Sequence, residues 1–193
     1  MNRKSRGLTM IELVVTLAVL GILAAAAFPA MGDFIDRQRL VSQTLAISEI
    51  AQTARSEATK RSASGASELK SVAMTVNAGD DSAWFVGLRN GTNACADAPD
   101  LKDVTCKINQ GGTDVPYIAR WKESQCSGCT LATTAAGPIV FDLRGLVTGA
   151  AAETSITLTS PKAKELRVRI SRLGRISLCS PGGTVTGYKP CPA

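Results

Sequence analysis

Apolar and polar residues follow three different patterns along the 193 residues of this chain. Residues 8–31 are almost continuously apolar, and residues 32–61 repeat apolar side chains at spacings of four and three. The second pattern places those side chains on one face of an α-helix. From Val72 onward the period falls to two, which is typical of β-strands with one buried face. We therefore expect one long helix over about residues 8–61, followed by a β-rich globular domain over residues 62–193.

The strand-like region divides into short segments that are rich in β-branched residues and separated by turn residues. This arrangement favours an antiparallel sheet, and hence an α+β fold in which the amphipathic half of the helix packs on the sheet. The stretch 90–112 has no clear period and is expected to be a long loop, pinned by a disulfide bond. The predicted strands are Ser71–Asn77, Ala83–Arg89, Tyr117–Lys122, Pro138–Leu143, Ser155–Thr159, Glu165–Ser171 and Arg175–Cys179.

Charge is unevenly distributed at the start of the chain. Arg3, Lys4 and Arg6 precede Gly7, and the apolar run that follows contains a single charge, Glu12. The run is long enough to cross a bilayer, which needs about 20 apolar residues, and the basic residues mark its cytoplasmic side. A carboxylate within such a segment costs about 2–4 kcal/mol, so we expect Glu12 to have a functional partner.

The segment R-G-L-T-M-I-E-L-V-V-T-L-A-V-L-G-I-L-A-A-A-A-F-P resembles the N-terminus of type IV pilins and pseudopilins. The resemblance implies that a prepilin peptidase removes residues 1–7 as a leader by cutting between Gly7 and Leu8, and that Leu8 is then N-methylated. It also implies that residues 8–31 form the transmembrane and polymerisation helix, in which Glu12 meets the N-terminal ammonium of a neighbouring subunit. The family most often has Phe after the cut, and Leu8 keeps that position apolar.

Two other interpretations of this segment compete with the pilin interpretation. An ordinary secretory signal peptide would be cut at a small-residue site within Ala24–Ala27. Against it, Glu12 interrupts the apolar core, and the chain beyond Phe28 continues as a helix. The second alternative is a transmembrane anchor that is not cleaved, for which the apolar segment 8–31 is long enough. Cleavage after Gly7 distinguishes the pilin interpretation from both.

The chain has six cysteines and no histidine, and all six cysteines lie beyond residue 90. An even number of cysteines in an exported domain indicates disulfide bonds, for which many connectivities are open. We favour the local pairing Cys95–Cys106, Cys126–Cys129 and Cys179–Cys191, because each pair closes a polar loop rich in Gly or Pro. A redox role for Cys126–Cys129 would require a helix N-terminus, and zinc would require four ligands. No metal or cofactor site is therefore expected.

Two later segments resemble the GspH/FimT group of minor pilins, to which FimT and FimU belong. I-V-F-D-L-R-G-L over 139–146 is similar to that group's apolar-x-Phe-Asp-x-x-Gly strand and turn, and R-V-R-I-S-R-L-G-R-I-S-L-C over 167–179 is similar to its final hairpin. The resemblance implies a minor pilin that primes type IV pilus assembly and lies near the filament tip. It implies other minor pilins, major pilins, a prepilin peptidase and the inner membrane as partners. The globular domain would lie in the periplasm before assembly and at the cell surface afterwards.

The C-terminal end is strongly basic, with seven Lys or Arg and one acid over residues 160–193. Such a patch can bind phosphates without sequence preference, so DNA is a candidate partner. FimT-type DNA-uptake pilins carry a similar Gly-Arg-x-Arg motif near the end, but here Ser177 replaces the second Arg after Gly174 and Arg175. A solvated strand face or a contact with another minor pilin is the competing interpretation. The candidate DNA-binding residues are Arg167, Arg169, Arg172, Arg175 and Lys189.

No acid in the sequence is placed with a nucleophile or base in a way that indicates catalysis, so we do not expect an enzyme. The favoured function is that of a minor pilin that primes assembly. Two alternatives stay open: a type II secretion pseudopilin of the GspH kind, and a DNA-binding pilin for natural transformation.

Overall fold

The computed structural model describes residues 9–60, 71–78, 84–96, 105–110, 113–120, 126, 128–148 and 153–192. The chain forms two compact units, Met1–Ile35 and Asp36–Ala193. Helix α1 (Met10–Lys60) contributes its first half to the first unit and its second half to the second. The leader and the cleavage site, residues 1–7 with Leu8, lie outside the described residues.

The first unit presents large apolar side chains that nothing in the described part of that unit covers. Leu13 is 53% exposed and Leu20 is 60% exposed. Across the described part of the chain, the structure contains no helix that meets the length and hydropathy required to cross a membrane. The other exposed apolar side chains of this segment are Met10, Ile11, Val14, Val15, Leu17, Val19, Ile22 and Leu23.

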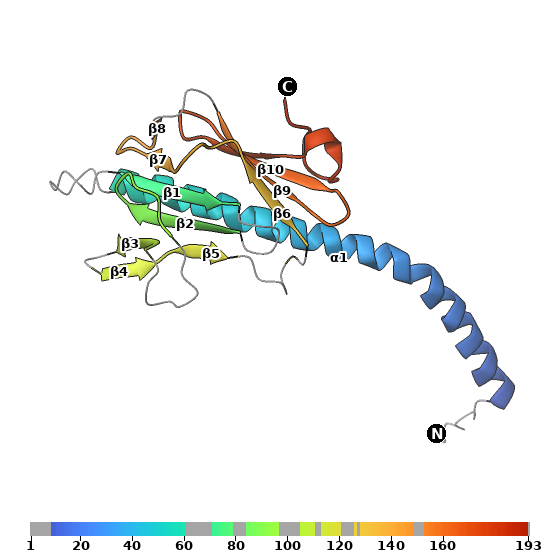
Figure 1. The fold of residues 1–193 in the computed structure, drawn as a ribbon. Coiled ribbons are helices and arrows are strands. Elements are labelled where there is room, and N and C mark those ends of the chain that lie inside the picture. Colours follow the sequence, from blue (N-terminus) through green and yellow to red (C-terminus); the bar gives the residue numbers. More distant parts are fainter. Residues whose placement is uncertain are drawn as a thin grey trace, which may run out of the picture. The chain divides into compact units, whose positions relative to one another are not determined.

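In the second unit, α1 buries the stripe that its spacing predicts. Leu40, Ile47, Ala51, Ala54 and Ala58 are all nearly or fully inaccessible to solvent. Small alanine side chains over the last two turns let the strands approach the helix closely, since little volume separates the backbones. Figure 1 shows the labelled strands gathered around this half of α1.

The strands of the described residues form three antiparallel sheets. A long N-terminal helix followed by antiparallel sheets confirms the predicted α+β class, which is consistent with a pilin fold. The first sheet has the order β5 (Ile118–Arg120), β2 (Phe85–Asn90), β1 (Val72–Asn77), β7 (Ile139–Phe141) and β8 (Val147–Thr148). The second has the order β11 (Ile176–Cys179), β10 (Glu165–Ile170), β9 (Thr154–Thr159) and β6 (Thr130–Thr133), and the third pairs β3 (Lys107–Gln110) with β4 (Thr113–Pro116).

The long loop expected over residues 90–112 is only partly a loop. Its end folds into β3, which pairs with β4, and the hairpin is anchored by the fully buried side chain of Ile108. The period of two is present here, because Cys106 and Ile108 are buried while Lys107 and Asn109 are half-buried. Strands β6 and β8 also lie outside the predicted strands.

One hydrophobic core joins the helix to both larger sheets. Phe141 and Met74 come from the first sheet, and Leu158 and Ile170 from the second, and all four are at most 1% exposed. A smaller cluster of Phe85, Cys95 and Cys106 lies apart from this core. The short 3-10 helix η3 (Pro181–Gly183) follows β11 and begins the C-terminal tail.

Candidate functional site

The first candidate site is the start of α1, where Glu12 lies. The backbone N–H of Glu12 donates to Thr9 Oγ1 at 3.3 Å and to the Thr9 carbonyl oxygen at 3.1 Å. Thr9 therefore caps the helix, and the order Thr-x-x-Glu is that of a capping box. A carboxylate in the first turn also interacts favourably with the helix dipole. This second role of Glu12 goes beyond the role expected in assembly, and the spacing of Thr9 and Glu12 is the signal for it.

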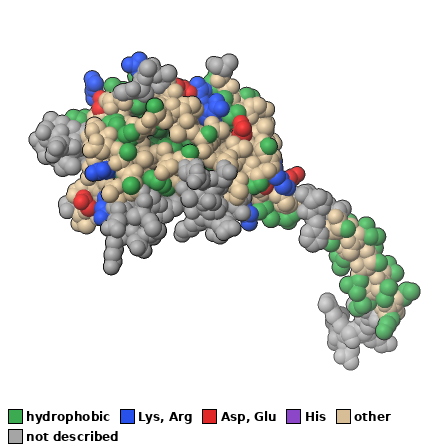
Figure 2. All heavy atoms as spheres, viewed as in Figure 1, with side chains coloured by type: hydrophobic (Ala, Val, Ile, Leu, Met, Phe, Trp, Pro, Cys, Tyr) green, Lys and Arg blue, Asp and Glu red, His purple; other side chains and the backbone are tan. Residues whose placement is uncertain are grey.

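The surroundings of Glu12 are apolar. Figure 2 shows hydrophobic side chains over the N-terminal helical segment. Exposed apolar patches of this kind mark surfaces that contact lipid or protein. The role predicted for Glu12 in assembly concerns a second subunit and stays a prediction.

The second candidate site is the C-terminal basic surface, which we define as Arg167, Arg169, Arg172, Arg175 and Lys189. On β10 the side chains of Val168 and Ile170 are buried, so Arg167 and Arg169 share the opposite face, as the alternation predicts. Arg167 Nε donates to Thr157 Oγ1 on β9 at 3.0 Å. This hydrogen bond orients the Arg167 guanidinium along the sheet.

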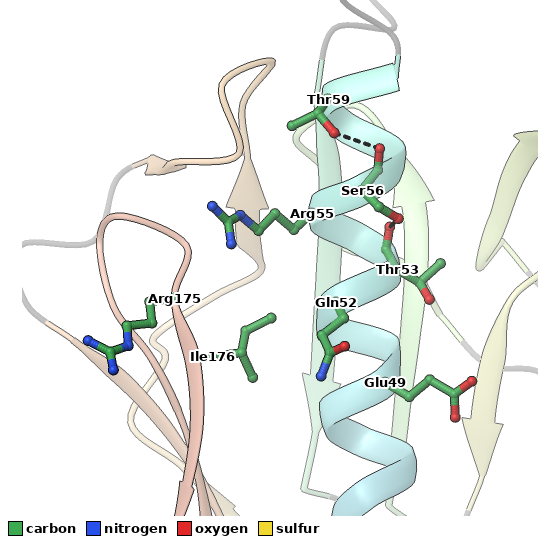
Figure 3. A pocket seen from close by; sticks show the side chains of 8 residues that line it. All are labelled: Glu49, Gln52, Thr53, Arg55, Ser56, Thr59, Arg175 and Ile176. Carbon is green, nitrogen blue, oxygen red and sulfur yellow. Dashed lines mark hydrogen bonds between the residues drawn. The ribbon is translucent and has the colours of Figure 1, made fainter.

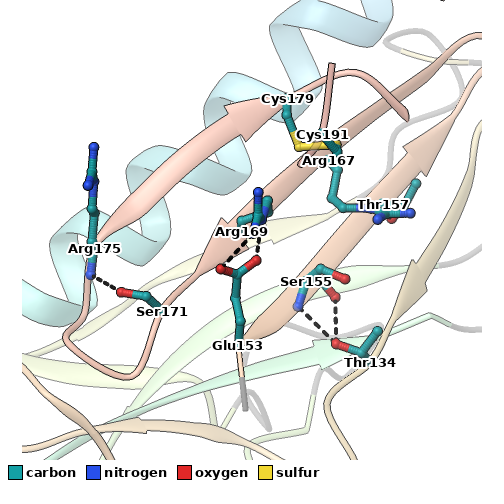
Figure 4. A network of polar contacts seen from close by, with 10 residues as sticks. All are labelled: Thr134, Glu153, Ser155, Thr157, Arg167, Arg169, Ser171, Arg175, Cys179 and Cys191. Atoms are coloured by element: carbon teal, nitrogen blue, oxygen red, sulfur yellow. Dashed lines mark hydrogen bonds and ion pairs between the residues drawn. A yellow bond between two sulfur atoms is a disulfide. The ribbon is translucent and has the colours of Figure 1, made fainter. Parts of the chain in front are cut away.

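Arg169 has an acidic partner that the sequence analysis did not identify. Its Nε donates to Glu153 Oε1, and its Nη2 donates to Glu153 Oε2 at 3.0 Å, as Figure 4 shows. The hydrogen bond to Glu153 raises the pKa of the Arg169 guanidinium above its usual value. The bidentate pair therefore neutralises one of the five cations on this surface.

Apart from Arg169, the cations of the C-terminal basic surface have no ion pair among the described residues. Arg167 is half-buried and bonded to Thr157, which leaves Arg172, Arg175 and Lys189 as the cations that face solvent. Arg175 and Lys189 line a hollow of about 400 Å³ together with Ser177. The backbone N–H of Arg175 donates to Ser171 Oγ at 3.1 Å, so the start of β11 is tied to the turn before it.

A larger groove of about 730 Å³ lies on the other side of Arg175. It is bounded by Arg175 and Ile176 at the start of β11 and by one face of α1. In Figure 3 the Arg55 side chain extends from α1 toward β11, whereas that of Glu49 extends away from Ile176. Arg55 belongs to no motif of the sequence, and only the structure places it beside β11. The α1 residues along the groove are Glu49, Gln52, Thr53, Arg55, Ser56 and Thr59.

The expectation of disulfide bonds is confirmed. Bonds join Cys95 to Cys106, Cys126 to Cys129 and Cys179 to Cys191, and no cysteine is left free. Cys126 and Cys129 are 2% and 0% exposed within the core. Among the described residues, no group of His, Cys, Asp or Glu is arranged to hold a metal ion.

Comparison with known proteins identifies the N-terminal segment. The family model described as the prokaryotic N-terminal methylation motif matches residues 2–28. No curated protein and no solved structure matches the chain. The motif supports a type IV pilin-like protein, that is, a pilin or pseudopilin subunit with a structural role. It implies processing by a prepilin peptidase and assembly with other pilins.

Proposed function

We propose that this protein is a minor pilin of a type IV pilus, of the GspH/FimT kind, which primes assembly and lies near the filament tip. The observation that carries the proposal is Glu12, placed in the first turn of an uncovered apolar helix within the methylation motif. The disulfide-bonded β domain beyond it supports an extracytoplasmic location. Its two segments that resemble the GspH/FimT group favour a minor pilin over a major one.

The proposed assembly step depends on charge in an apolar environment. Before assembly, residues 8–31 lie in the inner membrane with the globular domain in the periplasm. Cleavage between Gly7 and Leu8 creates an α-amino group, which is methylated and retains a positive charge. When this helix enters the filament, Glu12 pairs with the ammonium of a neighbouring subunit, and the pairing removes the cost of an isolated carboxylate among apolar side chains.

Two measurements test the assembly role. Mass spectrometry of the mature protein should find methylated Leu8 as the first residue. In cells, Glu12→Gln should reduce incorporation into sheared filaments at least tenfold, while the protein stays in the membrane fraction. The matched control is Thr9→Ala, which weakens the helix cap but keeps the carboxylate. If Thr9→Ala lowers incorporation as much as Glu12→Gln, capping explains the effect and the proposed pairing is wrong.

DNA binding is a second candidate function, and the exposed cations Arg172, Arg175 and Lys189, which have no ion pair among the described residues, favour it. Binding through phosphates weakens with salt in proportion to the number of contacts. Arg175→Glu should therefore lower the affinity for duplex DNA and flatten its salt dependence while piliation survives. If Arg175→Glu and the unmodified protein shift duplex DNA equally at every salt concentration of a gel-shift series, DNA binding through this surface is excluded.

A type II secretion pseudopilin of the GspH kind is the remaining alternative. The N-terminal motif is common to both classes of subunit, so it does not separate them. Deletion of the gene distinguishes them, because loss of surface pili supports the minor pilin and loss of exoprotein release with intact pili supports the pseudopilin.

A further inference from the structure

Strand β11 forms an open edge of the second sheet. In the described part of the chain it pairs only with β10. The N–H of Ser171 donates to the carbonyl oxygen of Arg175, which identifies these two as a hydrogen-bonded pair. Because such pairs alternate along an antiparallel ladder, the backbone N–H and C=O groups of Ile176 and Leu178 point away from β10. Two donors and two acceptors are thus directed out of the sheet.

The chain itself shows that this edge accepts an extended segment. The next outward-facing residue is Ser180, whose N–H donates to the Lys189 carbonyl oxygen at 2.9 Å. The N–H of Cys191 donates to the Ser180 carbonyl oxygen at 3.3 Å, so the tail makes a parallel bridge with this edge. The Cys179–Cys191 disulfide holds the tail there. Among the described residues the tail bonds to this edge only at Ser180, and it makes no backbone hydrogen bond with Ile176 or Leu178.

The groove of about 730 Å³ lies beside the open part of this edge. Its helical side extends from Glu49 to Thr59. At 1.5 Å per residue this face is about 15 Å long. An extended segment of about four or five residues has the same length. The groove therefore offers space for one short strand next to Ile176.

The charged side chains beside the β11 edge determine which kind of strand could pair with it. Arg55 and Arg175 line the groove with one acid, Glu49. Arg169, Arg175 and Lys189 line the hollow on the other side of β11 with one acid, Glu153, which is paired with Arg169, so cations prevail on both sides. Cations on an edge strand oppose pairing between two copies of the same edge, because like charges would face each other. The same cations attract a segment that carries carboxylates. A second copy of β11 is therefore a poor occupant, and an acidic strand is a good one.

We propose that the β11 edge binds an extended, acidic segment of a partner subunit by β-strand addition. Backbone hydrogen bonds to Ile176 and Leu178 would supply affinity, and contacts with Arg55, Arg175 and Lys189 would select acidic side chains. Only the partner's identity as another pilus subunit rests on the proposed function. The binding mode rests on the edge, the groove and the charges.

The test uses the full-length protein in detergent micelles and three fluorescent heptapeptides. The first has the sequence Thr-Val-Asp-Val-Asp-Val-Thr, the second has Lys in place of Asp, and the third is the acidic peptide with alternate backbone nitrogens methylated. We expect the acidic peptide to bind at least tenfold more tightly than either of the others in fluorescence anisotropy. No binding of the acidic peptide, or equal binding of the methylated one, would overturn the proposal.

Protein variants separate backbone pairing from charge. Ile176→Pro removes an outward-facing N–H that β10 does not use, and proline is tolerated at such edge positions. It should weaken binding of the acidic peptide at least tenfold. The double variant Arg55→Glu and Arg175→Glu should instead bind the Lys peptide more tightly than the acidic one. Arg39→Glu, an exposed change elsewhere on α1, is the matched control and should leave both affinities unchanged.

The outcomes also separate this inference from the proposed function. Glu12→Gln should not alter peptide binding, because Glu12 lies in the other unit of the chain. Conversely, Ile176→Pro should leave cleavage at Gly7 and methylation of Leu8 intact. If neither Ile176→Pro nor the charge-reversed double variant changes the affinity of the acidic peptide, this edge is not its binding site.

Discussion

The α-carbon of Gly174 faces the carbonyl oxygen of Gly145 so closely that a Cβ added to Gly174 would lie 1.9 Å from that oxygen. Gly145 belongs to the turn between β7 and β8, and Gly174 to the turn between β10 and β11, so the contact joins the two larger sheets. A backbone hydrogen bond from Val147 to Arg172 at 2.9 Å reinforces the contact. The two segments that resemble the GspH/FimT group therefore meet at one point of the fold.

Gly174→Ala should destabilise the protein strongly. The residue has φ of +69°, which L-amino acids rarely adopt, and the new methyl group would overlap a backbone atom that cannot move independently. We expect the free energy of unfolding to fall by about 2–4 kcal/mol, measured by urea unfolding of the full-length protein in detergent. The control is Gly137→Ala, because a Cβ at Gly137 meets nothing within 4 Å. Similar losses from both substitutions would show that the Gly145 contact is not the cause.

Asp142 should make the stability depend on pH in the acidic range. Burial tends to raise the pKa of this carboxyl, but hydrogen bonds from the N–H groups of Leu146 and Arg144, both at 2.8 Å, and from the Arg144 side chain lower it below its usual value. A lowered pKa in the folded state means that the stabilisation is fully present above the unfolded pKa, about 3.9. This stabilisation is lost as the pH falls through the pKa that the Asp142 carboxyl has in the folded state.

Asp142→Asn tests this dependence. It should cost about 1–3 kcal/mol of unfolding free energy at pH 7, because hydrogen bonds to a charged acceptor are weakened or lost. The difference between the two proteins should shrink as the pH is lowered from 4 toward 2. A difference that stays constant over that range would mean that the charge of Asp142 does not stabilise the turn.

The sequence predicts the fold well where the hydrophobic period continues over a whole helix or strand. It predicts less well those interactions that depend on which residues of two strands lie opposite each other. The helix and the paired strands β9 and β10 follow uninterrupted patterns. The β3 hairpin was missed because Cys106 was interpreted as part of a loop, although with Ile108 it forms the buried half of an alternation. Glu153 was missed because its contact with Arg169 arises only when β9 and β10 pair in one particular register, which the local sequence does not fix.

The Cys179–Cys191 disulfide should hold the C-terminal tail on the β11 edge. The bond closes a loop with a sequence separation of 12, and the tail buries Val185 to 1% exposure. Replacing both cysteines by Ser should cost about 2–3 kcal/mol by the chain-entropy model. The tail should then become sensitive to limited proteolysis. The corresponding change at Cys95 and Cys106 should leave the tail resistant, and equal sensitivity in both variants would argue against a local effect.

Gly87 and the Cys95–Cys106 disulfide should be energetically coupled. A Cβ at Gly87 would lie 2.5 Å from Cys106 Sγ and 3.0 Å from Cys95 Sγ, so the strand and the disulfide share a space that only glycine leaves open. Gly87→Ala should therefore reduce the free energy of unfolding by about 1–3 kcal/mol, as overpacking in a rigid core does. The disulfide is the obstacle, because the three nearest atoms are its two sulfur atoms and the Cβ of Cys106.

A double-mutant cycle measures this coupling. In a background with Cys95→Ala and Cys106→Ala, the substitution Gly87→Ala should cost less by about 1 kcal/mol or more, since the sulfur atoms that it would strike are absent. Non-reducing mass spectrometry should also show slower closure of the Cys95–Cys106 bond in Gly87→Ala during refolding. Equal costs of Gly87→Ala in both backgrounds would mean that the strand relaxes freely, and that the glycine is not required by the disulfide.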